Sequence, residues 1–87
     1  MKKSKYSPYR AHSTLSALPP GSWATVLTVV GPGFIALRLM EMGLIPGASI
    51  SVVRSAPLGD PIHIKLRDYH LALRRTEAEL INVALAD

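Results

Sequence analysis

Three histidines are the side chains of this sequence best suited to metal chemistry, so their placement is the first test of function. His12 falls in a polar N-terminal stretch, whereas His63 and His70 flank a predicted hairpin turn at Asp68-Tyr69. In that register the two lie four pairing positions apart, roughly 13 Å at about 3.3 Å per residue, which is too far for one metal ion. We therefore predict no preformed metal site, and a surface site shared between chains stays open.

No other group of residues has the spacing of a catalytic site. The sequence contains no cysteine, which excludes thiolate nucleophiles, disulfides and zinc–thiolate sites. The close acids Glu77 and Glu79 are two residues apart and would not share a helical face. Gly31-Pro32-Gly33 resembles a phosphate-binding turn only superficially, because no Gly-Lys-Ser/Thr follows it. We expect no catalytic residues, no cofactor and no enzyme activity.

The net charge of +4 belongs to the N-terminus. Residues 1–14 contain Lys2, Lys3, Lys5 and Arg10 and no acid, while the remaining chain carries six basic and six acidic residues. This basic extension is either a solvated terminus or a weak tether to the anionic cytoplasmic leaflet of a membrane. No apolar run approaches the ~18 residues of a membrane span, and no signal peptide is present, so we expect a cytoplasmic protein.

The stretch from Leu37 to Gly47 predicts the end of a short helix followed by a turn. Gly43 closes the helix and Pro46-Gly47 forms the turn. Apolar residues cover an arc from about 80° to about 300°, roughly twice the stripe of an ordinary surface helix: Ile35, Ala36, Leu37, Leu39, Met40, Met42 and Leu44. Either two buried surfaces enclose this helix, or part of it, around Leu37 and Met40, docks on another protein.

The rest of the chain reads as short strands. Alternating and β-branched residues predict strands over residues 23–30, 48–54, 62–67, 70–74 and 80–85. The turn at Asp68-Tyr69 would pair Leu66 with Leu71 and Arg67 with His70. Five strands and one helix inserted after the first strand predict an all-β fold, a small partly closed barrel, because closure removes exposed sheet edges.

One hairpin of this barrel would carry a modest basic patch made of Lys65, Arg67, His70 and Arg74. Small barrels can bind nucleic acid through such a face, but they usually add stacking aromatic residues. Tyr69 is the one aromatic residue near it in the sequence. Nucleic-acid binding is therefore kept as the alternative function, against a solvated sheet face.

Four blocks of the sequence, in order, resemble the FeoA family, ferrous iron transport protein A. They are Leu15-x-x-Leu18-x-Pro20-Gly21, residues 38–47 (RLMEMGLIPG), residues 56–62 (APLGDPI) and residues 71–78 (LALRRTEA). The resemblance covers about residues 15–85 and implies an SH3-like barrel over 15–87, with residues 1–14 outside the pattern as a basic extension.

The resemblance also implies a partner. FeoA-like proteins are regarded as accessory proteins of FeoB, a membrane ferrous-iron permease with a cytoplasmic GTP-binding domain, and not as enzymes. The same fold occurs as the C-terminal domain of metal-dependent repressors similar to DtxR, a second alternative. One departure is Asp68, which stands where the hairpin turn usually has glycine and can take left-handed geometry.

The wide apolar arc and the loop over residues 56–61 together predict the surface that engages the transporter. The residues expected to contact the partner are Leu37, Met40, Leu44, Pro57 and Leu58.

Overall fold

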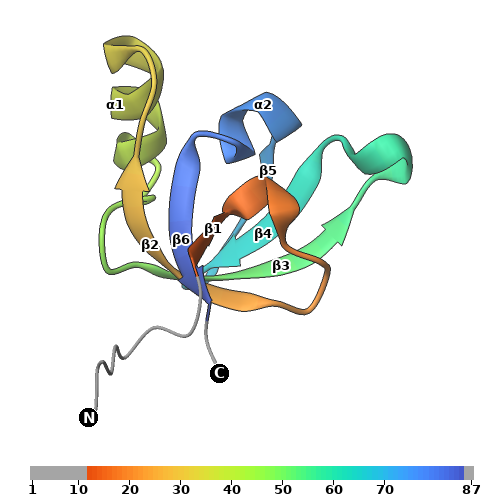
Figure 1. Ribbon diagram of the computed structural model, residues 1–87. Helices are drawn as coiled ribbons and strands as arrows, with labels where there is room; N and C mark the ends of the chain where they lie inside the picture. The colour runs from red at the N-terminus through yellow and green to blue at the C-terminus, as the bar shows by residue number, and fades with distance from the viewer. Residues whose placement is uncertain (1–11, 86–87) are drawn as a thin grey trace, which may run out of the picture.

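The computed structural model describes residues 12–85, which form six antiparallel strands in one curved sheet (Figure 1). The strands are β1 (His12–Thr14), β2 (Trp23–Val29), β3 (Ser49–Ser55), β4 (Ile62–Leu66), β5 (Tyr69–Leu73) and β6 (Ile81–Leu85). The helical elements are α1 (Gly33–Glu41), α2 (Arg75–Ala78) and the 3-10 turns η1 (Leu15–Ala17) and η2 (Pro57–Gly59). This arrangement confirms the predicted all-β class with a short helix after the strand that begins at Trp23.

Strand β1 was not predicted, because residues 1–14 show no strand periodicity and were expected to form an extension. The three residues of β1 pair with β6, with Ser13 opposite Val83, so the folded domain begins before Leu15. Residues 1–11 lie outside the described part of the chain, and with them Lys2, Lys3, Lys5 and Arg10 of the predicted basic extension.

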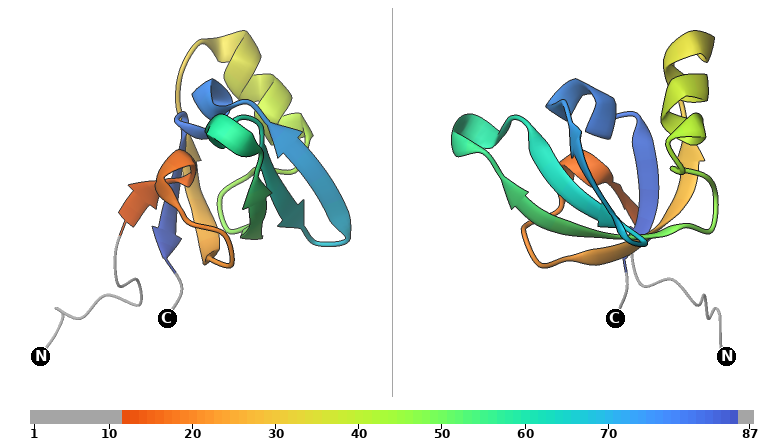
Figure 2. Two further views of the ribbon diagram at one scale, coloured as in Figure 1. Left: turned by 90° about the vertical axis from the view of Figure 1, so that its right-hand side faces the viewer. Right: turned by 180° about the vertical axis from the view of Figure 1, so that it is seen from behind.

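The sheet order is β1-β6-β2-β3-β4-β5, so β6 lies between β1 and β2. The last strand therefore does not close the sheet against β5, and β1 and β5 are the two edges. The strong curvature visible in both views of Figure 2 brings these strands around a common interior. The barrel is partly closed.

The interior is filled by one apolar cluster. Side chains from β2, β3, β4, β5 and β6 point into it, and Leu15 of η1 and Leu18, which follows η1, are buried against it. The largest fully buried side chains are Leu15, Leu39, Leu44, Ile50, Ile62, Ile64, Leu66, Leu73, Ile81, Val26, Val52 and Val83. Because α1 contributes Leu39 to this set, the helix is anchored along one side only.

The turn between β4 and β5 lies one residue earlier than predicted. Leu66 pairs with Tyr69 and Ile64 with Leu71, so the two turn residues are Arg67 and Asp68. The predicted pairing of Leu66 with Leu71 was wrong. Arg67, and not Asp68, has the positive φ, 56°. A left-handed backbone is costly for a residue that carries a Cβ, so the turn is held by the pairing on either side of it.

Replacing Arg67 by glycine is expected to stabilise the fold. Glycine adopts positive φ without the Cβ penalty, so Arg67→Gly should raise the free energy of unfolding by about 0.5–1 kcal/mol. Urea denaturation followed by circular dichroism measures the change. Asp68→Gly is the matched control, and it should give no gain because Asp68 lacks a positive φ. A gain only from Asp68→Gly would contradict the observed turn.

The predicted end of α1 is confirmed. Gly43 has φ 106°, and a Cβ built there would lie 2.8 Å from Leu66 Cδ2, so glycine is required both by the backbone and by close packing. Gly47 has φ 93°, and the Ala48 amide donates to the Ile45 carbonyl at 3.0 Å across the Pro46-Gly47 turn. Figures 1 and 2 show α1 standing beyond the end of β2.

Candidate protein-interaction surface

The apolar arc of α1 divides into a buried half and an exposed half. Leu39 is buried, and Ile35 and Met42 are partly buried and pack against the core. On the other side, Leu37 is 56% exposed and Met40 is 37% exposed. The interpretation that two buried surfaces enclose this helix is therefore not what the described residues show, and part of its apolar surface is open to solvent.

The exposed residues of the arc, Leu37 and Met40, continue along the helix into Phe34, which lies outside the predicted arc. Phe34, Leu37 and Met40 are spaced three residues apart, so they follow one another on the same side of α1. All three are exposed. We call these three residues the α1 stripe. Large apolar side chains gathered in this way are a feature of contact surfaces.

Leu44 does not belong to this surface. Its side chain is 0% exposed and forms part of the core cluster. The residue follows the left-handed Gly43, which turns the chain back toward the barrel after α1 ends. The expected contact at Leu44 is corrected accordingly: this side chain anchors the segment after the helix and is not available to a partner.

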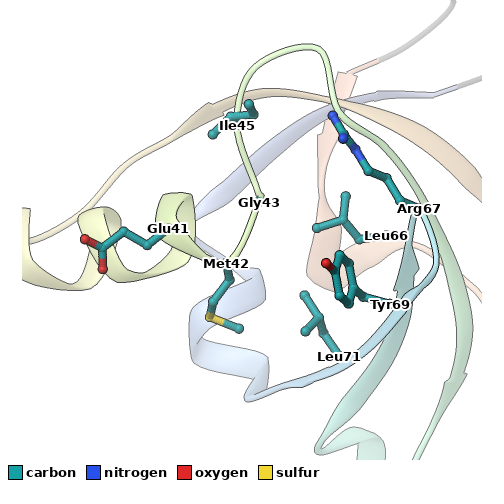
Figure 3. Close-up of a pocket in the computed structure, with 8 residues that line it drawn as sticks. All are labelled: Glu41, Met42, Gly43, Ile45, Leu66, Arg67, Tyr69 and Leu71. Atoms are coloured by element: carbon teal, nitrogen blue, oxygen red, sulfur yellow. The ribbon is translucent and has the colours of Figure 1, made fainter.

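A groove of about 450 Å³ lies between the end of α1 and the β4–β5 hairpin (Figure 3). Its walls are mostly apolar, with the charged Glu41 and Arg67 on opposite sides. The full lining is Glu41, Met42, Gly43, Ile45, Leu66, Arg67, Tyr69 and Leu71. No sequence pattern indicates this groove, because the predicted hairpin has Tyr69 in the turn, whereas it is the first residue of β5, which forms one wall.

Leu58 is the second exposed apolar site that the sequence predicted. Its side chain is fully exposed at the tip of η2, and its backbone has φ 71°. Pro57 precedes it and is also exposed. A left-handed backbone is unfavourable for leucine, and the exposed side chain makes no core contact that would offset this cost. Leu58 is therefore an exposed apolar side chain that the core does not use.

The α1 stripe and Leu58 do not form one patch. Figures 1 and 2 place α1 and η2 at the same end of the barrel but on opposite sides of α2. Arg38 of α1 forms an ion pair with Glu77 of α2. On the other side, the Arg75 amide donates to Asp60 Oδ1 at 3.1 Å, just after η2. The short helix α2 thus connects the two apolar sites.

Glu77 is expected to contribute more to stability than its ion-pair partner. Its Oε1 accepts the Arg74 amide at 2.9 Å at the start of α2, while its Oε2 binds Arg38. Glu77→Ala should therefore cost about 1 kcal/mol through the lost cap. Arg38→Ala removes only an exposed ion pair and should cost under ~0.5 kcal/mol. Thermal or urea denaturation measures both, and equal losses would contradict a capping role.

The corrected hairpin register changes the metal argument. Lys65 lies opposite His70, so His63 and His70 are diagonal neighbours, roughly 7–8 Å apart, and not four positions apart. The separation inferred from the sequence was wrong. Two imidazoles supply fewer protein ligands than even an open zinc site uses. Among residues 12–85, no group of three or more His, Cys, Asp or Glu side chains could hold a metal ion.

Sequence reasoning also missed the position of Trp23. Its indole is 59% exposed on the outer side of β2 and lines a hollow together with Lys65 and Arg67. Trp23 lies more than 40 positions before Lys65 and Arg67 in the chain, so only the alignment of β2, β3 and β4 brings it next to them. The predicted basic patch therefore has an aromatic neighbour that its sequence surroundings did not indicate.

The class of this molecule is a small, mostly β barrel with one inserted helix that exposes part of its apolar surface. Residues 13–85 match the FeoA domain, and the chain belongs to the FeoA family. The family resemblance of the sequence is thus confirmed. FeoA is a small accessory domain associated with transport and is not a known enzyme family.

One curated relative joins this domain to a transporter. The Fe(2+) transport protein A/Fe(2+) transporter FeoB fusion protein of Porphyromonas gingivalis is 42% identical over 71 residues. The match covers 82% of this chain but only 8% of the fusion protein. The family is therefore linked to ferrous iron transport, and in this homologue it shares one polypeptide with FeoB.

Solved structures of the family have the same architecture. The solution structure of FeoA from Chlorobium tepidum is 41% identical, with a TM-score of 0.80, and the match covers 86% of this chain and 71% of that chain. The zinc complex of FeoA from Stenotrophomonas maltophilia, described as a prokaryotic SH3 domain protein, is 31% identical with a TM-score of 0.71. That match covers 85% of this chain and 89% of the other. The expected SH3-like fold is confirmed.

The fold also resembles part of metal-dependent repressors. The crystal structure of IdeR from T. acidophilum is 22% identical with a TM-score of 0.76, and the match covers 88% of this chain and 35% of that one. At this identity the likeness concerns the fold alone. None of the helices in residues 12–85 is long and apolar enough to cross a bilayer.

Proposed function

We propose that this protein is a cytoplasmic accessory protein of ferrous iron uptake that binds a FeoB-type permease. The observation that carries the proposal is the relative in which a FeoA domain and FeoB form one chain. Domains that are fused in one protein commonly act together, and a FeoA domain that acts with FeoB needs a surface that contacts it. The exposed apolar residues of α1 and η2 can supply such a surface.

The α1 stripe is the proposed principal contact. Phe34, Leu37 and Met40 expose apolar area that the monomer leaves unburied, and burial of such area is the main favourable term in association. The flexible thioether of Met40 suits a contact that must adapt to its partner. Pro57 and Leu58 form the proposed second contact, held at a fixed position relative to α1 through α2.

Capture of the permease tests this function directly. The full-length protein, immobilised through its C-terminus, is incubated with the purified cytoplasmic part of the FeoB-type permease from the same genome. Retention of the permease domain, with none on an immobilised unrelated SH3-like barrel, is the expected result. No retention, in the presence or absence of guanine nucleotide, would contradict the proposal.

Leu58→Gly separates binding from folding. Glycine relieves the positive φ of residue 58, so the variant should be more stable by about 1 kcal/mol. It also removes an exposed side chain whose burial is worth about 1.5–3 kcal/mol, so permease capture should weaken roughly tenfold or more. Thermal denaturation and a binding titration measure the two effects. A variant that is more stable yet binds less cannot be explained by unfolding.

Val53→Thr is the matched control for Leu58→Gly, because it removes an exposed apolar side chain from β3, outside the proposed contacts. It should leave permease capture unchanged. Unchanged capture by Leu58→Gly as well would remove η2 from the proposed surface.

A further inference from the structure

A row of side chains crosses four neighbouring strands on the outer side of the sheet. Trp23 of β2 lies opposite Ser51 of β3, Ser51 lies opposite Lys65 of β4, and Lys65 lies opposite His70 of β5. Ser51 is nearly buried even though it faces outward, which places it beneath its larger neighbours. The indole and the lysine thus stand side by side above a small residue.

This outer face is positively charged and contains no acid within its strands. None of β2, β3, β4 and β5 includes an aspartate or glutamate, whereas Arg54 and Lys65 are exposed on β3 and β4. Arg67 adds a third exposed cation at the hairpin turn, next to Asp68. Within residues 12–85, none of these three cations takes part in an ion pair. The face therefore favours an anionic partner.

The same face exposes two apolar side chains. They are Trp23 and Val53. Val53 has no partner on β4, because the pairing of β3 with β4 is irregular between Val52 and Arg54 and leaves it as an extra residue. Cations surrounding exposed apolar groups are the composition of surfaces that lie at the boundary between water and lipid.

A hollow of about 430 Å³ lies between the indole and the cations. Its lining combines Trp23, Lys65 and Arg67 with three small residues, Gly47, Ala48 and Ser49. Small residues there leave room for a group the size of a phosphate to approach both cations. Lysine and arginine donate charge-assisted hydrogen bonds to phosphate oxygens, which gives the hollow a preferred ligand chemistry.

We propose that the outer face of β2–β5 binds the surface of an anionic phospholipid bilayer. Trp23 lies at the level of the headgroups, where indole rings are enriched in membrane proteins. Arg54, Lys65 and Arg67 contact lipid phosphates. The inference rests on the proposed function in one respect, since a partner of a membrane permease works next to a bilayer.

A nucleic acid is the less favoured occupant. Single strands are bound on small barrels through successive stacking aromatics, and Trp23 is the one tryptophan, tyrosine or phenylalanine in this row. Val53 has no counterpart in that mode of binding, whereas a bilayer accepts both apolar side chains. Nucleic acid is retained as an outcome of the experiment.

Trp23 is the single tryptophan of the chain, so its fluorescence reports on the face directly. The full-length protein is titrated with vesicles of equal parts phosphatidylglycerol and phosphatidylcholine, and separately with pure phosphatidylcholine. The expected result is a blue shift and quenching by brominated acyl chains with the anionic vesicles alone, reversed by high salt. If the protein binds the anionic vesicles but its Trp23 fluorescence does not change, the proposal is overturned. The N-terminal basic residues alone would then explain the binding.

Variants identify the residues responsible, with co-sedimentation as the measure. Lys65→Gln and Arg67→Gly should each lower the vesicle partition coefficient about fivefold, the effect of one cation near an anionic surface. Arg74→Gln is the control, because it removes the same charge next to α2. It should change the vesicle partition coefficient by less than about twofold. Equal losses in all three would indicate a nonspecific charge effect and would overturn the assignment to this face.

Two further outcomes are decisive. A shift of Trp23 fluorescence with a single-stranded oligonucleotide, without any shift with vesicles, would overturn the lipid assignment in favour of nucleic acid. Permease capture in detergent-free solution is a separate measurement, so loss of vesicle binding with capture intact contradicts this inference and leaves the proposed function standing.

Discussion

Met40→Asp is expected to weaken capture of the cytoplasmic part of the permease by about thirtyfold, the equivalent of ~2 kcal/mol at an interface hot spot. Met40 is exposed in the free protein, so the fold should tolerate the aspartate. In the complex, the carboxylate would be buried against an apolar surface with no partner charge, which is strongly unfavourable. A titration by isothermal calorimetry measures the loss, and circular dichroism verifies the fold.

Ala17→Asp is the matched control, because it places the same charge at an exposed position on η1, outside α1 and η2. Its affinity for the permease domain should equal that of the wild type. Equal affinity of a folded Met40→Asp variant would show that α1 takes no part in the contact, and Leu37 and Phe34 would then lose their proposed role as well.

Leu44→Ala is expected to destabilise the protein by about 2–5 kcal/mol, the range for truncation of a buried leucine. Leu44 has no exposed surface, and its side chain connects the segment after α1 to the core. The loss is a large fraction of the ~5–15 kcal/mol that stabilises a typical domain. Urea denaturation gives the change in unfolding free energy.

The neighbouring Ile45 provides the comparison. Its side chain is exposed at the rim of the groove, so Ile45→Ala should cost under about 1 kcal/mol. A small loss for Leu44→Ala, comparable to that for Ile45→Ala, would contradict the assignment of Leu44 to the core.

Local signals made most of the fold predictable. Gly43 and Pro46-Gly47 determine where α1 ends and how the chain turns, since both depend on backbone angles that few residues adopt. Alternating apolar residues identified β4 from Ile62 onward, because successive side chains of a strand point to opposite faces. Short β1 carries no such pattern, and its strand character comes from pairing with β6.

The hairpin register could not be determined from side-chain alternation. Moving the turn from Asp68-Tyr69 to Arg67-Asp68 changes the partner of Leu66 from Leu71 to Tyr69, a shift of two residues. Side chains two residues apart on a strand point to the same face, so both registers satisfy the apolar pattern equally. The left-handed Arg67 gave no signal either, because arginine is not a residue that favours this geometry.

The candidate surface was partly predictable. The width of the apolar arc showed that α1 has more apolar surface than one core can cover, and Leu37 and Met40 are exposed as expected. The arc did not show which side faces the core, so Leu44 was misplaced. Trp23 and the groove depend on contacts between distant strands, which a single sequence does not encode locally.

The connection through α2 has a consequence for how a partner would be selected. Glu77 binds Arg38 of α1 with one carboxylate oxygen and accepts the amide of Arg74, the residue before α2, with the other, and the Arg75 amide donates to Asp60. The two proposed apolar contacts are therefore held at a set spacing in the free protein, so little ordering entropy would be lost on association. A rigid receptor whose recesses match that spacing gains from both contacts at once, whereas one with a different spacing gains from only one.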